Sequence, residues 1–184
     1  MTEHAEPQKG ASHMPAVLTA LIAIVFLTAV PFLVLRAGDR RAEPAVMDAD
    51  TRERTEGEKV YQRNCVGCHE PRGQGRPGQY PSLIGAPWLL GDKETAIRIV
   101  LLGVVGPMEC EGRTYNNAMP NFGVNLSDLD IARVLTFTRG HWGNQADAVN
   151  EAEVAKVRAS LGARTQPWGG GGELDAARKS AVLP

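Results

Sequence analysis

Cysteine and an excess of one charge are both scarce in this sequence. Three cysteines among 184 residues are too few for a disulfide framework, and at least one of them has no partner. With 20 basic and 21 acidic residues the formal net charge is −1, so we expect no nucleic-acid partner. The mean hydropathy of −0.21 excludes a polytopic membrane protein. The length predicts one domain with appendages rather than two full domains.

Charged residues are also missing from one long stretch near the start of the chain. Residues 10–35 contain no Asp, Glu, Lys or Arg. Residues 14–35 are apolar all round and would form roughly 33 Å of helix, enough to cross a bilayer core of about 30 Å once. The lack of a polar face argues against an interfacial helix. We predict an uncleaved transmembrane anchor at 14–35, after a cytoplasmic tail at 1–13 and before a linker at 36–50. A cleaved signal peptide, whose apolar region would be shorter, is the alternative.

Two of the cysteines belong to Cys65-Val-Gly-Cys68-His69, the C-x-x-C-H pattern of c-type haem attachment. Two thiols at this spacing can reach the two vinyl groups of one porphyrin, and the histidine would lie under the iron. A zinc site would need a second Cys/His pair, whereas Cys110 stands alone. A thioredoxin-like redox pair would need βαβ patterning nearby, which the sequence lacks. The motif therefore predicts one covalently attached haem c with its iron bound by His69.

The other axial position of that iron has three candidate ligands, Met108, Met119 and His141. Met119 precedes Pro120 in a polar, turn-forming loop without helical periodicity, where no core requires a methionine. His141 lies beyond a predicted helix, in a position typical of surface residues. We predict Met119 as the ligand and keep Met108 and His141 as alternatives.

The segment from about residue 52 to residue 142 resembles a class I cytochrome c domain. The matching features are Gly57-x-x-x-Tyr61, the haem motif, Pro81-Ser-Leu83, Met119-Pro120, a closing helix and Arg139-Gly-His-Trp142-Gly-Asn144. The resemblance implies an all-α fold around haem c, with His69 and Met119 on the iron and electron transfer as the activity. It places the cytochrome c domain at 51–145 and a C-terminal extension at 146–184. The likeness is strongest to monohaem cytochromes c attached to respiratory complexes, oxidases and periplasmic dehydrogenases.

The same resemblance implies roles for residues around the haem. The carbonyl of Pro81 would accept a hydrogen bond from Nδ1 of His69, which fixes the ring and raises its basicity. Tyr115, with Asn116 or Asn117, would order the methionine loop. One asparagine would hydrogen-bond the methionine sulfur or a haem propionate.

For two further residues, Trp88 and Cys110, the sequence gives less specific predictions. Trp88 could cover the haem edge, and its indole N–H would then be available to a propionate. Cys110 lies near the turn of a hairpin predicted within residues 103–115. It is either a redox or cross-linking thiol or a tolerated free cysteine.

Local signals also predict helix positions. Gly57 costs a helix about 1 kcal/mol relative to alanine, but its small size would let another helix approach closely. Asp92, Ser127 and Asn150 are N-cap residues by type. The predicted helices are 51–64, 93–102, one that begins after Ser127, and one that runs to Leu161. Residues 167–172 read as a flexible Gly-rich linker, and residues 173–184 as a short helix on a partner or as no regular structure.

We expect an electron carrier rather than an enzyme, because an iron with both axial positions filled has no place for a substrate. Covalent haem is attached on the outer side of the bacterial membrane, which predicts a single-pass protein of the cytoplasmic membrane with a periplasmic haem domain. The basic residues Arg36, Arg40 and Arg41 favour the opposite orientation by the positive-inside rule. The haem motif outweighs them.

The charge distribution favours a fixed subunit over a freely diffusing carrier. Residues 36–184 hold 19 basic and 19 acidic residues, so they lack the asymmetry that steers a mobile cytochrome. Our preferred hypothesis is a subunit that passes electrons from a quinol-oxidising membrane module, such as alternative complex III, towards a terminal oxidase. The alternatives are the electron-accepting subunit of a periplasmic dehydrogenase for alcohols or sugars, and a haem-based sensor.

Overall fold

The computed structural model describes residues 17–18, 20–21, 23–25, 27 and 48–182. The chain divides into two compact units, Met1–Val46 and Met47–Pro184, and each is considered by itself. Most of the predicted tail, anchor and linker (residues 1–50) lies outside the described residues. The described residues before 28 are helical, and their large apolar side chains are exposed. Among the described residues, no helix combines the length and the apolar composition needed to cross a bilayer.

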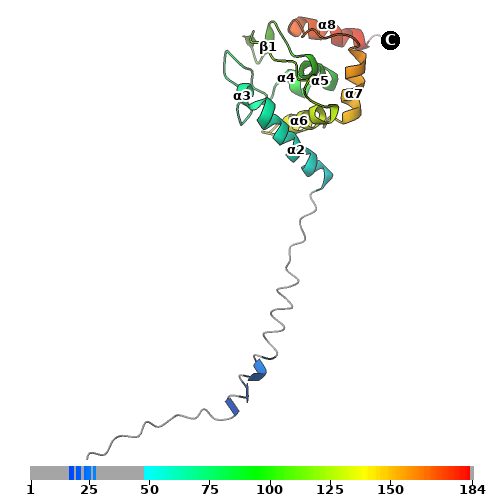
Figure 1. Ribbon diagram of the computed structural model, residues 1–184. Coiled ribbons are helices and arrows are strands. Elements are labelled where there is room, and N and C mark those ends of the chain that lie inside the picture. Colours follow the sequence, from blue (N-terminus) through cyan, green and yellow to red (C-terminus); the bar gives the residue numbers. More distant parts are fainter. Residues whose placement is uncertain (1–16, 19, 22, 26, 28–47, 183–184) are drawn as a thin grey trace, which may run out of the picture. The chain divides into compact units, whose positions relative to one another are not determined.

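The second unit is mostly helical, as predicted, and carries one small hairpin (Figure 1). The helices are α2 (Ala49–Asn64), α3 (Val66–His69), α4 (Pro87–Leu90), α5 (Lys93–Leu102), α6 (Asp128–Gly140), α7 (Glu151–Ser160) and α8 (Gly171–Val182). The strands β1 (Met108–Cys110) and β2 (Arg113–Tyr115) pair antiparallel, with Met108 opposite Tyr115. This pairing confirms the hairpin expected within residues 103–115.

The predicted N-caps are confirmed at three helices. The side chains of Asp92 and Ser127 accept hydrogen bonds from backbone N–H groups in the first turns of α5 and α6. Asn150 does the same for α7, and the side chain of Glu153 accepts from the backbone N–H of Asn150. These two reciprocal bonds form a capping box, which satisfies donors that a helix start would otherwise leave unpaired.

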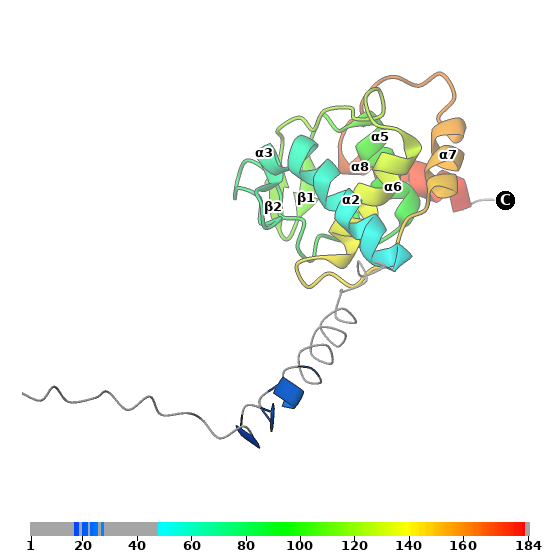
Figure 2. The same ribbon diagram turned by 60° about the horizontal axis from the view of Figure 1, so that its bottom comes forward.

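Helices α2 and α6 cross each other (Figure 2), and they approach closely at Gly57, which has no side chain. A Cβ atom at Gly57 would overlap the carbonyl oxygen of Arg133 and lie 2.8 Å from Cβ of Phe137. The close helix approach predicted from this glycine is therefore confirmed. It brings the fully buried ring of Tyr61 to 5.7 Å from the ring of Phe137 and 5.1 Å from that of Trp142, measured between centroids.

One ion pair also joins these two helices. The Nε atom of Arg133 donates to Glu53 at 2.7 Å, and this hydrogen bond holds the pKa of the Glu53 carboxyl below its usual value. The pair is partly open to solvent, and such pairs contribute about 0.2–1 kcal/mol. Apolar packing at Gly57 and Tyr61 therefore dominates the helix crossing.

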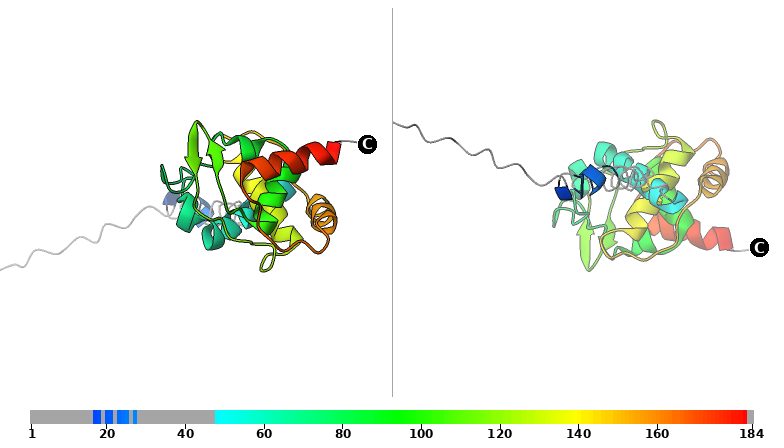
Figure 3. Two further views of the ribbon diagram at one scale, coloured as in Figure 1. Left: turned by 90° about the horizontal axis from the view of Figure 1, so that it is seen from above. Right: turned by 90° about the horizontal axis from the view of Figure 1, so that it is seen from below.

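A larger core lies between α5, α6, α7 and the end of the chain. Its most completely buried members are Ile97, Leu101, Ile131, Val154, Val157 and Leu174. Leu174 belongs to α8, which lies on the same side of the domain as the hairpin (Figure 3). The predicted boundary after residue 145 thus does not separate two compact units, because the extension completes the core of the domain.

The segment from Pro167 to Gly172 differs from the flexible linker that its composition predicts. Trp168 is only 4% exposed. Its backbone N–H donates to the carbonyl of Gly103, and its carbonyl accepts from the N–H of Val105. A Cβ atom at Gly170 would lie 2.5 Å from the carbonyl oxygen of Pro107. The glycines here allow two backbones to pack closely, which composition alone does not distinguish from flexibility.

Candidate haem site

The haem motif follows α2 directly, and its last four residues form the short helix α3. Helix α2 ends at Asn64, and the backbone N–H groups of Cys68 and His69 both donate to the carbonyl of Cys65, at 3.2 and 3.0 Å. Cys65 and His69 line one cavity, and both cysteines with His69 line an adjoining one. Both thiols are free of disulfide bonds. The motif thus places two thiols and one imidazole around the same space.

The ring of His69 is oriented by the backbone at Pro81. Its Nδ1 atom lies 3.0 Å from the Pro81 carbonyl oxygen, which is the contact that the sequence resemblance implies. A carbonyl only accepts, so Nδ1 carries a proton, and in the neutral ring Nε2 has the free lone pair. Burial lowers the pKa of His69, although the hydrogen bond to Pro81 opposes that shift. Burial therefore favours the neutral imidazole, which is the form that binds a metal.

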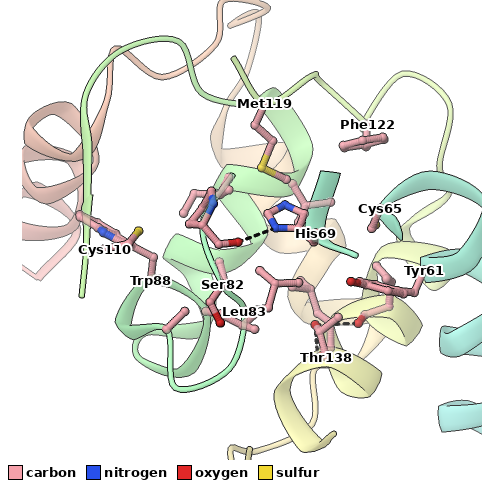
Figure 4. A pocket seen from close by; sticks show the side chains of 18 of the residues that line it. Tyr61, Cys65, His69, Ser82, Leu83, Trp88, Cys110, Met119, Phe122 and Thr138 are labelled. Carbon is pink, nitrogen blue, oxygen red and sulfur yellow. Dashed lines mark hydrogen bonds between the residues drawn. The ribbon is translucent and has the colours of Figure 1, made fainter. Parts of the chain in front are cut away.

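Two adjoining cavities meet at His69 and Met119. Their volumes are about 110 and about 240 Å³. The residues that line both are Cys65, His69, Pro81, Met119 and Phe122. Figure 4 shows the sulfur of Met119 turned toward the His69 ring.

The wall of the first cavity fits a porphyrin rather than a polar ligand. It is formed mainly by the apolar side chains of Leu83, Ala86, Leu89, Ile99, Val100, Phe122, Leu126, Val134 and Leu135. The hydroxyl of Thr138 also lies there, but it donates within its own helix, to Val134 O at 2.9 Å. Apolar walls, two free thiols, an imidazole nitrogen and a thioether sulfur together match the needs of a covalently attached haem.

The same structure argues against the two alternatives to haem, a thioredoxin-like cysteine pair and a zinc site. Burial raises the pKa of the Cys65 thiol to about 12, so it is not a thiolate prepared for redox exchange. Within the described part of the chain, no three His, Cys, Asp or Glu side chains gather closely enough to hold a metal ion. Neither a thioredoxin-like pair nor a zinc site is therefore favoured.

The loop of Met119 is fixed by its backbone. Val104 and Met119 exchange hydrogen bonds in both directions, at 3.0 and 2.9 Å. Next to this bridge, a Cβ atom at Gly103 would overlap the carbonyl of Met119, and Gly103 has a φ of +71°. Only glycine fits this close approach without strain. The sulfur of Met119 is thus carried on a well-defined backbone beside the cavity.

The other two candidate ligands are less well placed. Met108 lines the second cavity only, from the start of β1. His141 lines neither cavity; its exposed ring stacks on Phe137 with 4.6 Å between centroids. The geometry therefore favours Met119, whose bond to the iron remains a prediction.

Two predicted haem contacts differ from expectation. Asn116 is exposed and lines neither cavity, whereas Tyr115 and Asn117 on either side of it line the second. Tyr115 is the last residue of β2, and Asn117 lies in the bend that follows it. The indole N–H of Trp88 is not spare, because it donates to the carbonyl of Glu109 at 2.8 Å. Trp88 still lines the first cavity, as does Cys110, whose thiol pKa is raised by burial.

The cavity wall is held by two polar side chains whose role sequence reasoning missed. Asn144 accepts from the N–H of Gly85 and donates to the carbonyls of Leu83 and Thr138, at 2.8–3.0 Å. Arg139 is 2% exposed and donates to backbone carbonyls at Leu89, Gly91 and Asp147. These bonds fasten residues 83–91 to α6. Both residues belong to the motif Arg139-Gly-His-Trp142-Gly-Asn144, and this motif was the sequence feature that could have indicated their role.

Phe122 was also missed, although it lines both cavities. Its position three residues after Met119, as an aromatic in a polar loop, was the signal that could have identified it.

The fold and this site define the chain as a member of the cytochrome c family. The family model described as cytochrome c matches residues 55–142. The chain is 37% identical over 113 residues to cytochrome c-552 of Thermus thermophilus. The match covers 56% of this chain and 85% of that protein. It is an electron-transfer protein of the class I monohaem type, carrying one covalently bound haem c with its iron, and is not an enzyme by itself.

Cytochrome subunits of dehydrogenases are also related to this chain. The cytochrome c subunit of a quinone-dependent alcohol dehydrogenase from Gluconobacter oxydans is 34% identical over 107 residues. The gluconate 2-dehydrogenase cytochrome c subunit of Pantoea cypripedii is 37% identical over 108 residues. The matches cover 56% and 55% of this chain but only 22% and 24% of those subunits.

Proposed function

We propose that this cytochrome accepts electrons from a dehydrogenase that oxidises alcohols or sugar-derived substrates, and passes them on one at a time. The observation that carries the proposal is the similarity to cytochrome subunits of alcohol, gluconate and fructose dehydrogenases. The sequence features by themselves favoured a quinol-oxidising respiratory complex. The names of the relatives support the dehydrogenase alternative better.

The residues of the site suit such a carrier. The bound haem iron supplies a one-electron Fe(III)/Fe(II) couple. His69, held by Pro81, offers a neutral nitrogen, and Met119 offers a neutral sulfur, which favours the ferrous state. The apolar wall favours the same state, because the ferric form carries the extra charge. With His69 and Met119 both bound to the iron, the site would have no open position for a substrate.

The partner can be identified from native membranes. We expect the tagged full-length cytochrome, isolated in mild detergent, to bring a dehydrogenase with it. In the same preparation, its haem should become reduced when ethanol, gluconate or fructose is added, one substrate at a time. A variant with Cys65→Ala and Cys68→Ala, which cannot form the thioether bonds, provides the background. Co-isolation with quinol-oxidising subunits, and reduction by a quinol alone, would instead support the respiratory reading.

We further propose that residues 14–35 anchor the chain in the cytoplasmic membrane with the haem domain on the outer side. The uncharged run and the haem motif support this placement. Protease added to intact spheroplasts should then degrade the haem domain while a cytoplasmic marker protein stays intact. A haem domain that survives until the cells are lysed would contradict the outer placement.

A further inference from the structure

The C-terminal part of the domain returns to the methionine loop. Residues 164–174, here named the C-terminal strap, follow α7 and include the start of α8. The N–H of Trp168 donates to the carbonyl of Gly103 at 3.0 Å, and the N–H of Val105 donates to the carbonyl of Trp168 at 2.8 Å. Further along, the N–H of Gly171 donates to Pro107 O at 2.9 Å. The strap therefore lies parallel to residues 103–107.

Val104 connects this strap to Met119. On one side Val104 forms a parallel bridge with Trp168, and on the other an antiparallel bridge with Met119. Its side chain is only 4% exposed. The backbone of Met119 is thus supported by Val104, which is supported in turn by the strap.

Trp168 is the side chain that anchors the strap. Its indole N–H donates to the carbonyl of Arg98 in α5 at 3.0 Å. The guanidinium carbon of Arg164 lies 4.1 Å from the centre of the indole ring, and Arg164 also pairs with Glu173 at 2.8 Å. Glu173 accepts a hydrogen bond from the N–H of Gly169. The strap is therefore closed on itself and bound to α5.

The strap also packs against a residue of the cavity wall. A Cβ atom at Gly171 would lie 2.9 Å from Cζ2 of Trp88, and Trp88 lines the first cavity. Through Val104 and through Trp88, the same segment reaches both the methionine loop and the cavity wall.

We infer that the strap is a positioning element that holds the sulfur of Met119 on the haem iron. Trp168 acts through Val104 and does not touch the iron. This inference rests on the proposed His69/Met119 coordination. Where the strap is displaced, the methionine loop gains freedom, and an added ligand competes more successfully for the iron.

The first test compares two glycines of the strap in the haem-loaded, full-length protein. Gly170 has a φ of +99°, and its new Cβ atom would meet Pro107 O, whereas a Cβ atom at Gly172 would meet nothing within 4 Å. We expect Gly170→Ala to bind imidazole at the ferric iron on the order of tenfold more tightly than the wild type, within the range usual for coupled sites. Gly172→Ala should bind imidazole as the wild type does.

Three further variants separate positioning from general loss of stability. Trp168→Ala should weaken the red absorption band expected for a methionine–Fe(III) bond and speed hydrogen exchange at the N–H of Met119. Val154→Ala, in the fully buried core of α7 and away from both cavities, should leave the band and imidazole affinity unchanged. Trp168→Phe keeps an aromatic ring but loses the hydrogen bond to the Arg98 carbonyl. Its absorption band and its hydrogen-exchange rate should lie between those of the wild type and Trp168→Ala.

The outcomes distinguish this inference from the coordination on which it rests. A wild-type protein without the methionine band would show that Met119 is not the ligand, whatever the variants do. A wild type with the band, together with equal imidazole affinities for Gly170→Ala and Gly172→Ala, would overturn the strap inference alone. Failure of the dehydrogenase proposal would leave all of these readouts unchanged.

Discussion

Replacing Met119 with alanine will remove the methionine–Fe(III) absorption band and lower the reduction potential of the cytochrome. A neutral thioether stabilises Fe(II), so its loss favours Fe(III). We expect a fall on the order of 0.1–0.3 V, a fraction of the roughly 0.8 V that axial ligands span. The ferric variant should also bind added imidazole readily, because the position on the iron that Met119 would fill becomes open. A redox titration and an imidazole titration of the haem-loaded full-length protein measure the two effects.

Met108→Ala is the matched control for this experiment. Met108 also lines the second cavity, so its removal changes a methionine in the same region without touching the predicted ligand. It should keep the absorption band and shift the potential much less than Met119→Ala does. Loss of the band in Met108→Ala, with retention in Met119→Ala, would show that the two methionines have been assigned the wrong way round.

Replacing Gly57 with alanine will destabilise the protein by about 2 kcal/mol or more. The new methyl group would overlap the Arg133 carbonyl and lie 2.8 Å from Cβ of Phe137, so α2 must move away from α6. Overpacking costs about 1–3 kcal/mol and occasionally more, and a clash with backbone is hard to relax. The better helix propensity of alanine recovers only about 1 kcal/mol. The midpoint of guanidinium-induced unfolding of the haem-loaded protein measures the net effect.

Gly67→Ala is the control for that prediction. Gly67 also lies in a helix, α3, but is exposed, and a Cβ atom there would meet nothing within 4 Å. It should leave the stability unchanged or raise it by up to about 1 kcal/mol. Equal unfolding midpoints for Gly57→Ala and the wild type would contradict the tight crossing of α2 and α6.

The predicted helix crossing also bears on the haem site. Tyr61 lies one turn beyond Gly57 on α2, lines the first cavity, and donates its hydroxyl proton to the carbonyl of Glu70 at 2.7 Å. Burial raises the pKa of this tyrosine far above its usual value, so the hydroxyl stays protonated. A displaced α2 would therefore disturb the haem motif as well as the core. Gly57 thus supports both the packing of α2 on α6 and the position of Tyr61 in the cavity wall.

Predictions succeeded where the signal was local in the chain. The haem motif is five consecutive residues, and its meaning depends only on the reach of two neighbouring thiols. The caps Asp92, Ser127 and Asn150 act on N–H groups three residues away, so their types are informative by themselves. Gly57 was recognisable because an unfavourable residue inside a helix needs a reason.

Predictions failed where a side chain meets a distant partner. The N–H of Trp88 is taken by Glu109, 21 residues away, which no local pattern announces. The choice between Asn116 and Asn117 depends on how the chain bends after β2, which residue type alone does not reveal. The segment 167–172 reads as a linker because glycine serves both flexible chains and closely packed backbones.

By itself, the sequence determined the cofactor, the starts of α5, α6 and α7 and the choice of a cytochrome c fold, and it predicted His69 as the proximal ligand. Each of these depends on covalent reach or on hydrogen bonds between near neighbours. Only the tertiary structure decided how Met119 is supported, that Arg139 and Asn144 fasten the cavity wall, and that the C-terminal strap belongs to the domain. Those contacts join residues far apart in the chain, and they form because burying apolar surface brings their backbones together first.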